Sequence, residues 1–228
     1  NRSALSRVLE IQMRRGQMSE AAATANELVA VAASNKERAE TLSLLARLNR
    51  QNKNLDGAAN AFEQAVSMVG MEGTVAAEFK DLLLEQKLLG EDPRWDYYIG
   101  ALSGFSDQQS DPRKRSPIQL EIARVLADEM ELLDRALHTL QRALAQDSEN
   151  ADLRTELAKR LKAAGHYPQA LVELRRALHE TSGGDERVRT ELRRNAGMRR
   201  ASRDGGYHRT DAGSAVGQPF RTGAGGLE

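Results

Sequence analysis

The side chains most capable of chemistry are sparse in this sequence and are not spaced for a reaction. No two histidines form an HExxH motif or a facing i, i+4 pair, so they predict no metal site; they are His138, His166, His179 and His208. Cysteine is absent, which excludes disulfides and thiolate ligands. We therefore expect neither a metal nor a cofactor.

Acidic and serine residues give no catalytic pattern either. Adjacent acids such as Asp128 and Glu129 are typical of a solvated helix face. The sequence contains neither the GxSxG elbow of serine hydrolases nor the GxxxxGK[ST] loop that binds phosphate. No residue is predicted to be catalytic, so we expect the chain not to be an enzyme and look for its function in binding.

Charge and hydropathy narrow the class of partner. Lysine plus arginine number 33 and aspartate plus glutamate also number 33, so no overall field attracts the chain to nucleic acid. No apolar run reaches the roughly 18 to 20 residues that a spanning helix needs, so we expect no membrane insertion. A protein or peptide remains as the expected partner.

The start of the chain enters helical periodicity directly after Asn1. We infer a fragment of a longer repeat array, whose missing start could have carried a signal peptide or further repeats. We expect a cytoplasmic protein, or a periplasmic one if a signal peptide is missing. Further repeats or a second copy of the chain count among the expected partners.

The elements that would position binding residues repeat along the chain. Residues 151–162 carry an apolar stripe of helical period, Gly165 interrupts it, and a second stripe follows Pro168. This pattern predicts a helix, a tight turn and a second helix. Six residues recur 34 positions later, which indicates a solenoid of such units: Ala136, Leu137, Leu140, Arg142, Ala143 and Leu144 return as Ala170, Leu171, Leu174, Arg176, Ala177 and Leu178.

The best copy resembles the signature of the tetratricopeptide repeat family through Leu157, Ala158, Leu161, Gly165, Tyr167, Ala170, Leu174, Ala177 and Leu178. This resemblance implies an all-α fold, a right-handed superhelical solenoid of antiparallel helix pairs. It implies that Ala158 and Ala170 lie where the two helices cross. Leu174 and Ala177 would pack on the neighbouring repeat.

The template divides residues 1–183 into five copies, at 2–35, 39–72, 73–116, 117–150 and 151–182. The third copy is degenerate: we predict helices near 74–89 and from Asp92–Pro93, followed by a loop over 104–116. Arg113, Lys114 and Arg115 are interpreted as part of this solvated loop rather than as a docking patch. Residues 184–195 are predicted to form a capping helix, and the Gly/Arg-rich residues 196–228 to be disordered.

The resemblance also implies a concave groove lined by the first helix of each pair, which is the expected binding site. Its inward positions would be Ser43, Arg47, Arg50, Glu121, Asp128, Thr155, Lys159 and Lys162. Basic ends and an acidic middle favour an extended or helical peptide of mixed charge. We therefore predict an adaptor for another protein.

Two other functions stay open beside the adaptor. One is an architectural segment of a larger helical scaffold, in which the groove is empty and the ends contact more repeats. The other is RNA binding by helical repeats, against which zero net charge argues. The aromatic cluster is assigned mainly to packing: Trp95 and Tyr98, spaced i, i+3, would be core, and Tyr97 would be exposed.

Overall fold

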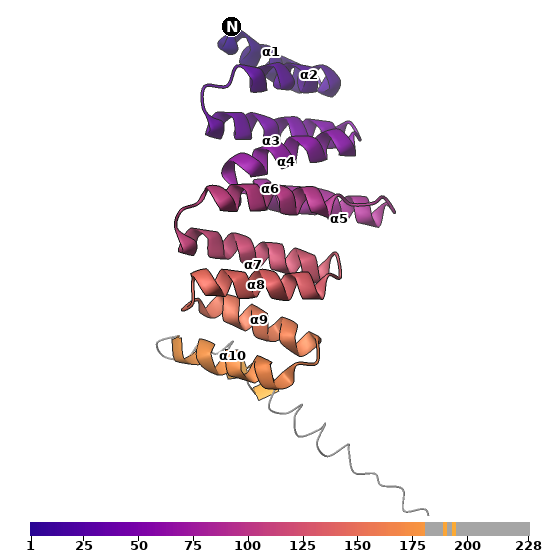
Figure 1. The fold of residues 1–228 in the computed structure, drawn as a ribbon. Helices are drawn as coiled ribbons and strands as arrows, with labels where there is room; N and C mark the ends of the chain where they lie inside the picture. Colours follow the sequence, from indigo (N-terminus) through magenta and orange to yellow (C-terminus); the bar gives the residue numbers. More distant parts are fainter. Residues whose placement is uncertain (181–188, 191–192, 195–228) are drawn as a thin grey trace, which may run out of the picture.

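The computed structural model describes residues 1–180, 189–190 and 193–194, and every regular element within them is an α-helix. The predicted all-α solenoid is confirmed, because successive helix pairs stack side by side into one elongated ribbon (Figure 1). Residues 196–228 lie outside the described part, as do most of residues 184–195, so the predicted cap and tail are not tested. The pairs are α1 (Arg2–Arg14) with α2 (Met18–Ala30), α3 (Asn35–Gln51) with α4 (Leu55–Val69), α5 (Val75–Leu88) with α6 (Trp95–Gln108), α7 (Pro112–Asp128) with α8 (Leu133–Gln146), and α9 (Ala151–Ala163) with α10 (Tyr167–Glu180).

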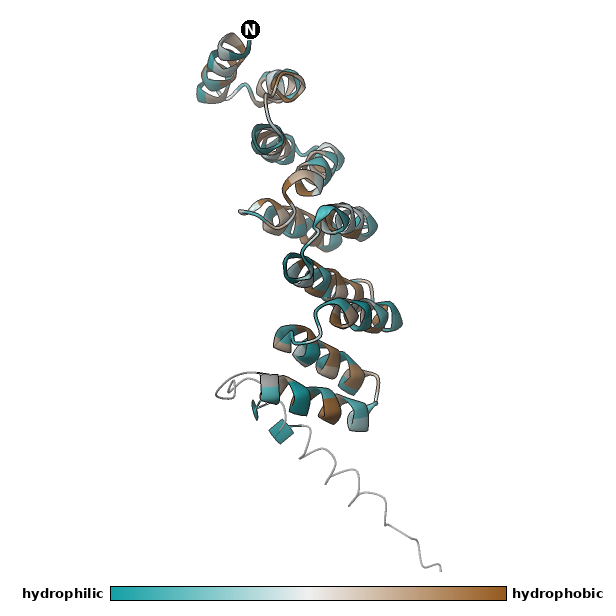
Figure 2. Cartoon of the chain, turned by 60° about the vertical axis from the view of Figure 1, so that its left-hand side comes forward, coloured by the Kyte–Doolittle hydropathy of each residue, from teal (hydrophilic) through white to brown (hydrophobic). Residues whose placement is uncertain are grey.

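Burial of one face of each helix holds the stack together. Figure 2 shows hydrophilic and hydrophobic residues sharing each helix, as expected for helices that bury one side. The buried apolar side chains form one continuous cluster that runs from Leu9 on α1 to Ala177 on α10. A single helix pair cannot cover its own apolar surface, so each pair depends on its neighbours for a core.

The turn inside each pair contains one residue with positive φ. Glycine takes this position three times, and a residue with a side chain takes it twice; the five are Gly16, Lys53, Gly90, Glu131 and Gly165. In the last pair, the N–H of His166 donates to the carbonyl of Leu161 at 2.8 Å, which closes the helix end. The left-handed residue thus marks the same point in every unit.

Where the two helices of a pair cross, the second helix has alanine in four of the five pairs, as Ala21, Ala58, Ala136 and Ala170. The first helix varies more at this point, with Leu9 in the first pair. Counted from the turn residue, the crossing positions are Ala46 and Ala58 in the second pair and Ala158 and Ala170 in the fifth, all with 0% exposure. In the third pair the same positions hold Leu83 and Trp95. Trp95 is the exception among the second helices, and α6 packs mainly on α4 and α7 rather than on α5.

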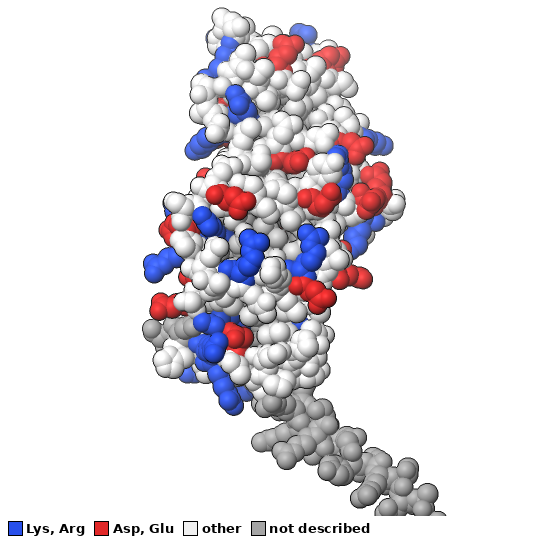
Figure 3. Space-filling view, in the orientation of Figure 1, with Lys and Arg blue, Asp and Glu red and all other residues white. Residues whose placement is uncertain are grey.

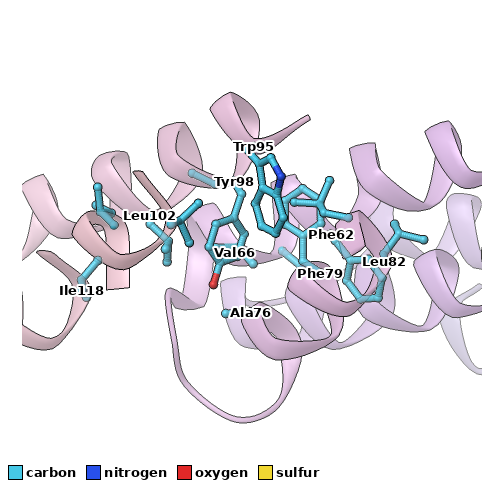
Figure 4. Packing of buried hydrophobic residues seen from close by; sticks show 14 of the residues in the cluster. Phe62, Val66, Ala76, Phe79, Leu82, Trp95, Tyr98, Leu102 and Ile118 are labelled. Carbon is cyan, nitrogen blue, oxygen red and sulfur yellow. The ribbon is translucent and has the colours of Figure 1, made fainter. Parts of the chain in front are cut away.

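An aromatic cluster fills the space that opens in the third pair (Figure 4). Phe79 lies 5.9 Å from Phe62 and 5.5 Å from Tyr98 between ring centroids. Trp95 is 3% exposed and Tyr98 1%, whereas Tyr97 is 38% exposed. The assignment of Trp95 and Tyr98 to the core and of Tyr97 to the surface is confirmed.

The end of α4 meets α6 at a position that only glycine fits. Gly70 follows α4 with a φ of 60°, and a Cβ atom there would lie 2.2 Å from the ring of Phe105. The ring therefore packs directly on the backbone of residue 70. This contact joins the second and third pairs through their second helices.

The loop predicted over residues 104–116 is wrong. Helix α6 continues to Gln108 and α7 begins at Pro112, so residues 109–111 alone connect them. The side chain of Asp111 accepts a hydrogen bond from the N–H of Arg113 at 3.0 Å, and proline suits the first helical position. This capping outweighs the loop-forming composition, and Arg113 and Lys114 lie in the first turn of α7.

Candidate protein-interaction surfaces

The first helices of the pairs, α1, α3, α5, α7 and α9, form one side of the array, here called the first-helix face. Ion pairs on this face run from each of these helices to the next. Arg2 of α1 pairs with Glu37 of α3, and the pattern continues through α5 and α7 to α9. Charged residues on this face are therefore partners of one another.

The basic residues predicted for the second copy are held by α5. The guanidinium of Arg47 binds the carboxylate of Glu78 with two bonds of 2.6 and 2.7 Å. Arg50 pairs with Glu85 at 2.6 Å. The hydrogen bond from Arg47 holds the pKa of Glu78 below its usual value. Neither arginine is left without a counter-ion.

The acidic residues predicted for the fourth copy are paired as well. The carboxylate of Glu121 lies 2.9 Å from Nζ of Lys80 on α5. Asp128 receives two bonds from Arg160 of α9, a guanidinium whose residue is 5% exposed, and these bonds hold the pKa of Asp128 below its usual value. Arg160 also binds Glu156 on its own helix, so the acidic middle of the predicted groove is already neutralised.

The remaining predicted residues differ in accessibility. Ser43 is 3% exposed and its hydroxyl donates to the carbonyl of Ala39, so we remove it from the set of binding residues. The hydroxyl of Thr155 likewise bonds its own helix, at Ala151. Lys159 is exposed and reaches Glu156 only at 3.8 Å, and Lys162 is half-buried.

The ion pairs of Arg47, Arg50 and Glu121 could not be predicted from the sequence, because their partners lie in the degenerate third copy. Glu78, Glu85 and Lys80 lie in the degenerate copy, whose register the family pattern does not give. The spacing of 31 to 35 residues between Arg47 and Glu78 and between Arg50 and Glu85 is the only signal that could have found them. Figure 3 shows both signs of charge interspersed along the array rather than gathered in one patch.

Hollows occur on the opposite side, between successive second helices, which we call the second-helix face. One lies between α2 and α4 over α3, another between α8 and α10 over α9. The third lies between α6 and α8 over α7 and has a volume of 520 Å³. The second-helix face therefore has surface grooves, whereas the sequence predicted a groove on the first helices alone.

The α6–α8 hollow combines an apolar floor with a polar rim. Its floor is formed by Ile99, Ile122 and Leu126. Its rim includes charged side chains of both signs, and no ion pair joins them to any other described residue; they are Asp107, Asp134, Arg135 and Arg142. An apolar floor with a charged, solvent-exposed rim has the composition of a protein-interaction surface.

The described residues contain neither a cluster of metal ligands nor a membrane-spanning helix. Among them, no three His, Asp or Glu side chains gather into a group that could hold a metal ion. No helix in this part is both long and apolar enough to cross a membrane.

The stack of helix pairs defines a helical-repeat protein, and comparison with known proteins specifies which kind. The family described as tetratricopeptide repeat matches residues 129–192. The resemblance predicted from the sequence is therefore confirmed, and such repeats support protein interaction in general. No curated protein matches the chain.

Solved structures with a similar fold include several repeat proteins. A structure of Pseudomonas aeruginosa PilF is 16% identical and covers 92% of this chain and 93% of its own, with a TM-score of 0.42. TTC0263, a thermophilic TPR protein of Thermus thermophilus, is 17% identical, covers 86% of this chain and 99% of its own, and has a TM-score of 0.46. The TPR2AB domain of yeast Sti1 in a complex with an Hsp90 peptide is 13% identical, with coverages of 89% and 83% and a TM-score of 0.36. At these scores we draw nothing further from the likeness.

Proposed function

We propose that this chain is an adaptor that holds a segment of another protein in the α6–α8 hollow of the second-helix face. The observation that supports this site is the apolar floor of Ile99, Ile122 and Leu126 beneath unpaired charges of both signs. A segment with apolar side chains flanked by acidic and basic residues would match it. The site thus moves from the first-helix face, where the charges are already paired, to the opposite side.

Site-resolved crosslinking tests the location. A photo-reactive residue replaces Thr139, which lines the hollow, in one variant and the exposed Lys159 of the first-helix face in another. We expect a protein from the native lysate to crosslink at position 139 and not at position 159. Crosslinking at 159 alone would return the site to the groove predicted from the sequence.

The affinity for a peptide from the crosslinked protein, measured by titration, then shows which of the two faces binds it. Ile99→Asp with Arg142→Glu should weaken this peptide at least about tenfold, because it places a charge on the apolar floor and reverses the rim. Lys159→Glu with Lys162→Glu serves as the matched charge-reversed control. Equal affinities of the first variant and the unmodified chain would contradict the proposal.

The ion pairs along the first-helix face favour a second candidate, an architectural segment of a larger scaffold. The end of the array supports it too: Val8 and Ile11 of α1 are 43% and 49% exposed, whereas Leu45 and Leu48, their counterparts in α3, are buried against neighbouring helices. If the chain is such a scaffold segment, another helix pair covers Val8 and Ile11 of α1. Assembly in sedimentation velocity that is lost with Val8→Asp and Ile11→Asp would support it, and a monomer at all concentrations would exclude it for this chain.

A further inference from the structure

A second exposed surface lies at the turn between α5 and α6, which reaches out from the edge of the array (Figure 1). Leu88 is 88% exposed and Leu89 63%, the highest values among the exposed large hydrophobic residues of the described chain. Scattered single apolar residues are ordinary on a surface, but two adjacent leucines at this exposure are not. We call this surface the α5–α6 edge, made of Leu88, Leu89, Glu91, Asp92, Asp96 and Tyr97.

A hollow of 610 Å³ lies at the same edge, and Lys87, which directly precedes the two leucines in the chain, lines it. Its wall includes Trp95, the exposed ring of Tyr97 and Met130 at the end of α7. Trp95 stands where the other four pairs have alanine, and α6 packs on α4 and α7 rather than on α5. The residue that departs from the repeat therefore also lines this hollow.

The charges around the hollow are not balanced. Nζ of Lys87 lies 3.2 Å from Glu129, so these two charges offset each other. Arg94 stacks 3.8 Å above the uncharged ring of Tyr97 and keeps its positive charge, which three further carboxylates outnumber. Glu91, Asp92 and Asp96 are exposed and form no ion pair with any described residue. At the level where Figure 1 draws this turn, the right-hand edge in Figure 3 carries acidic side chains with basic ones beside them.

Helix ends of both signs meet at this edge. Both α5 and α7 end here, since Lys87 and Glu129, which pair across it, lie at their C-terminal ends, whereas α6 begins here at Trp95. The partial negative charge of the C-terminal ends is therefore opposed by the partial positive charge of the α6 N-terminus. The excess of carboxylate side chains alone favours a cationic partner and disfavours an anionic membrane surface.

We propose that the α5–α6 edge binds a basic, leucine-rich or similarly apolar segment of another protein, with Leu88 and Leu89 as anchors and the three unpaired carboxylates selecting Lys and Arg. This surface is separate from the α6–α8 hollow. Its residues are not shared with that hollow, so either site can fail without the other.

The test uses the full chain and three fluorescent 14-residue helical peptides: one of Leu and Lys, one with Glu in place of Lys, and one with Ala in place of Leu. We expect the Leu/Lys peptide alone to bind. Leu88→Ser with Leu89→Ser should weaken it at least about tenfold, because the anchors of an interface carry most of its affinity. Glu91→Lys with Asp92→Lys should weaken it several-fold and shift preference toward the Leu/Glu peptide.

Matched controls change the same residue types elsewhere. Val31→Ser with Val172→Ser removes two other apolar side chains that are 45% exposed each, and Glu27→Lys with Glu149→Lys reverses two other exposed acids. Neither control should alter binding. No binding to the unmodified chain, equal binding by the Leu88/Leu89 variant, or equal loss in either control would overturn the proposal.

The same variants distinguish two other partners that could cover Leu88 and Leu89. Concentration-dependent association that disappears in the Leu88/Leu89 variant would show that a second copy of the chain covers this edge. Binding to vesicles containing one-third anionic lipid, lost in the same variant, would show a membrane surface instead. Either result would replace the proposed partner, and sedimentation velocity and vesicle flotation provide the readouts.

Discussion

The turns of the helix pairs allow a test in which stability should increase. Lys53 and Glu131 have φ values of 59° and 57°, at the turn position that glycine occupies in the other three pairs. Both side chains are exposed and neither forms a hydrogen bond or ion pair with a described residue. Replacing either with glycine therefore removes backbone strain and no contact.

The expected gain follows from two opposing effects. A residue with a Cβ atom in the left-handed region costs roughly 1 to 2 kcal/mol. Glycine recovers this cost but loses about 0.5 to 1 kcal/mol through the greater freedom of the unfolded chain. Lys53→Gly and Glu131→Gly should each raise the free energy of unfolding by about 0.5 to 1 kcal/mol, and the double variant by the sum because the turns are far apart.

Urea unfolding followed by circular dichroism measures these changes, with two controls. Lys53→Ala removes the same charge but keeps a Cβ atom, so it should change stability little. Gly165→Ala, at a φ of 80°, should lower stability by about 1 kcal/mol. If Lys53→Ala stabilised as much as Lys53→Gly, the charge and not the backbone would be responsible, and the argument would fail.

Three further predictions concern packing and pH. Leu174→Ala should lower the free energy of unfolding by about 2 to 5 kcal/mol and Ala170→Leu by about 1 to 3 kcal/mol, because both positions have 0% exposure; chemical unfolding of each variant checks this. Gly70→Ala should destabilise more than Gly165→Ala, since its Cβ would also clash with a ring; paired thermal melts compare them. Arg160 lowers the pKa of Asp128 in the folded chain, so the ionised Asp128 stabilises the fold. This stabilisation is complete above the unfolded pKa near 4 and is lost as pH falls through the lower folded pKa. Asp128→Asn should therefore lose less unfolding free energy in acid than the unmodified chain, which unfolding experiments between about pH 2 and 7 measure.

The fold could be predicted because its determinants are local. Gly165 and Pro168 mark a helix end and a helix start, and Ala158 and Ala170 stand at the crossing where only small residues fit closely. Trp95 and Tyr98 were placed correctly for a similar reason, since an i, i+3 pair of large rings on one helix is best buried. Such signals lie within one helix pair and require no knowledge of its neighbours.

The candidate sites could not be predicted in the same way because they depend on contacts between pairs. The positions of Arg47 and Asp128 on the first-helix face follow from the repeat, but the carboxylate and guanidinium that neutralise them come from adjacent pairs. The α6–α8 hollow also requires three helices from two pairs. Composition was misleading at residues 104–116, where the cap formed by Asp111 begins a helix in a segment rich in polar residues.

The third helix pair differs from the other pairs in the surface that it exposes to a partner. Ion pairs join the first helices along the whole array, α5 of the third pair included, and leave few charged groups on the first-helix face for a partner. Where Trp95 replaces the alanine, α6 makes little contact with α5 and packs on α4 and α7, and the α5–α6 edge carries exposed leucines and unpaired acids. Replacement of Trp95 by alanine would remove a 3% exposed ring at the centre of this arrangement, so binding at the edge and the stability of the third pair should decline together, whereas binding in the α6–α8 hollow should decline less.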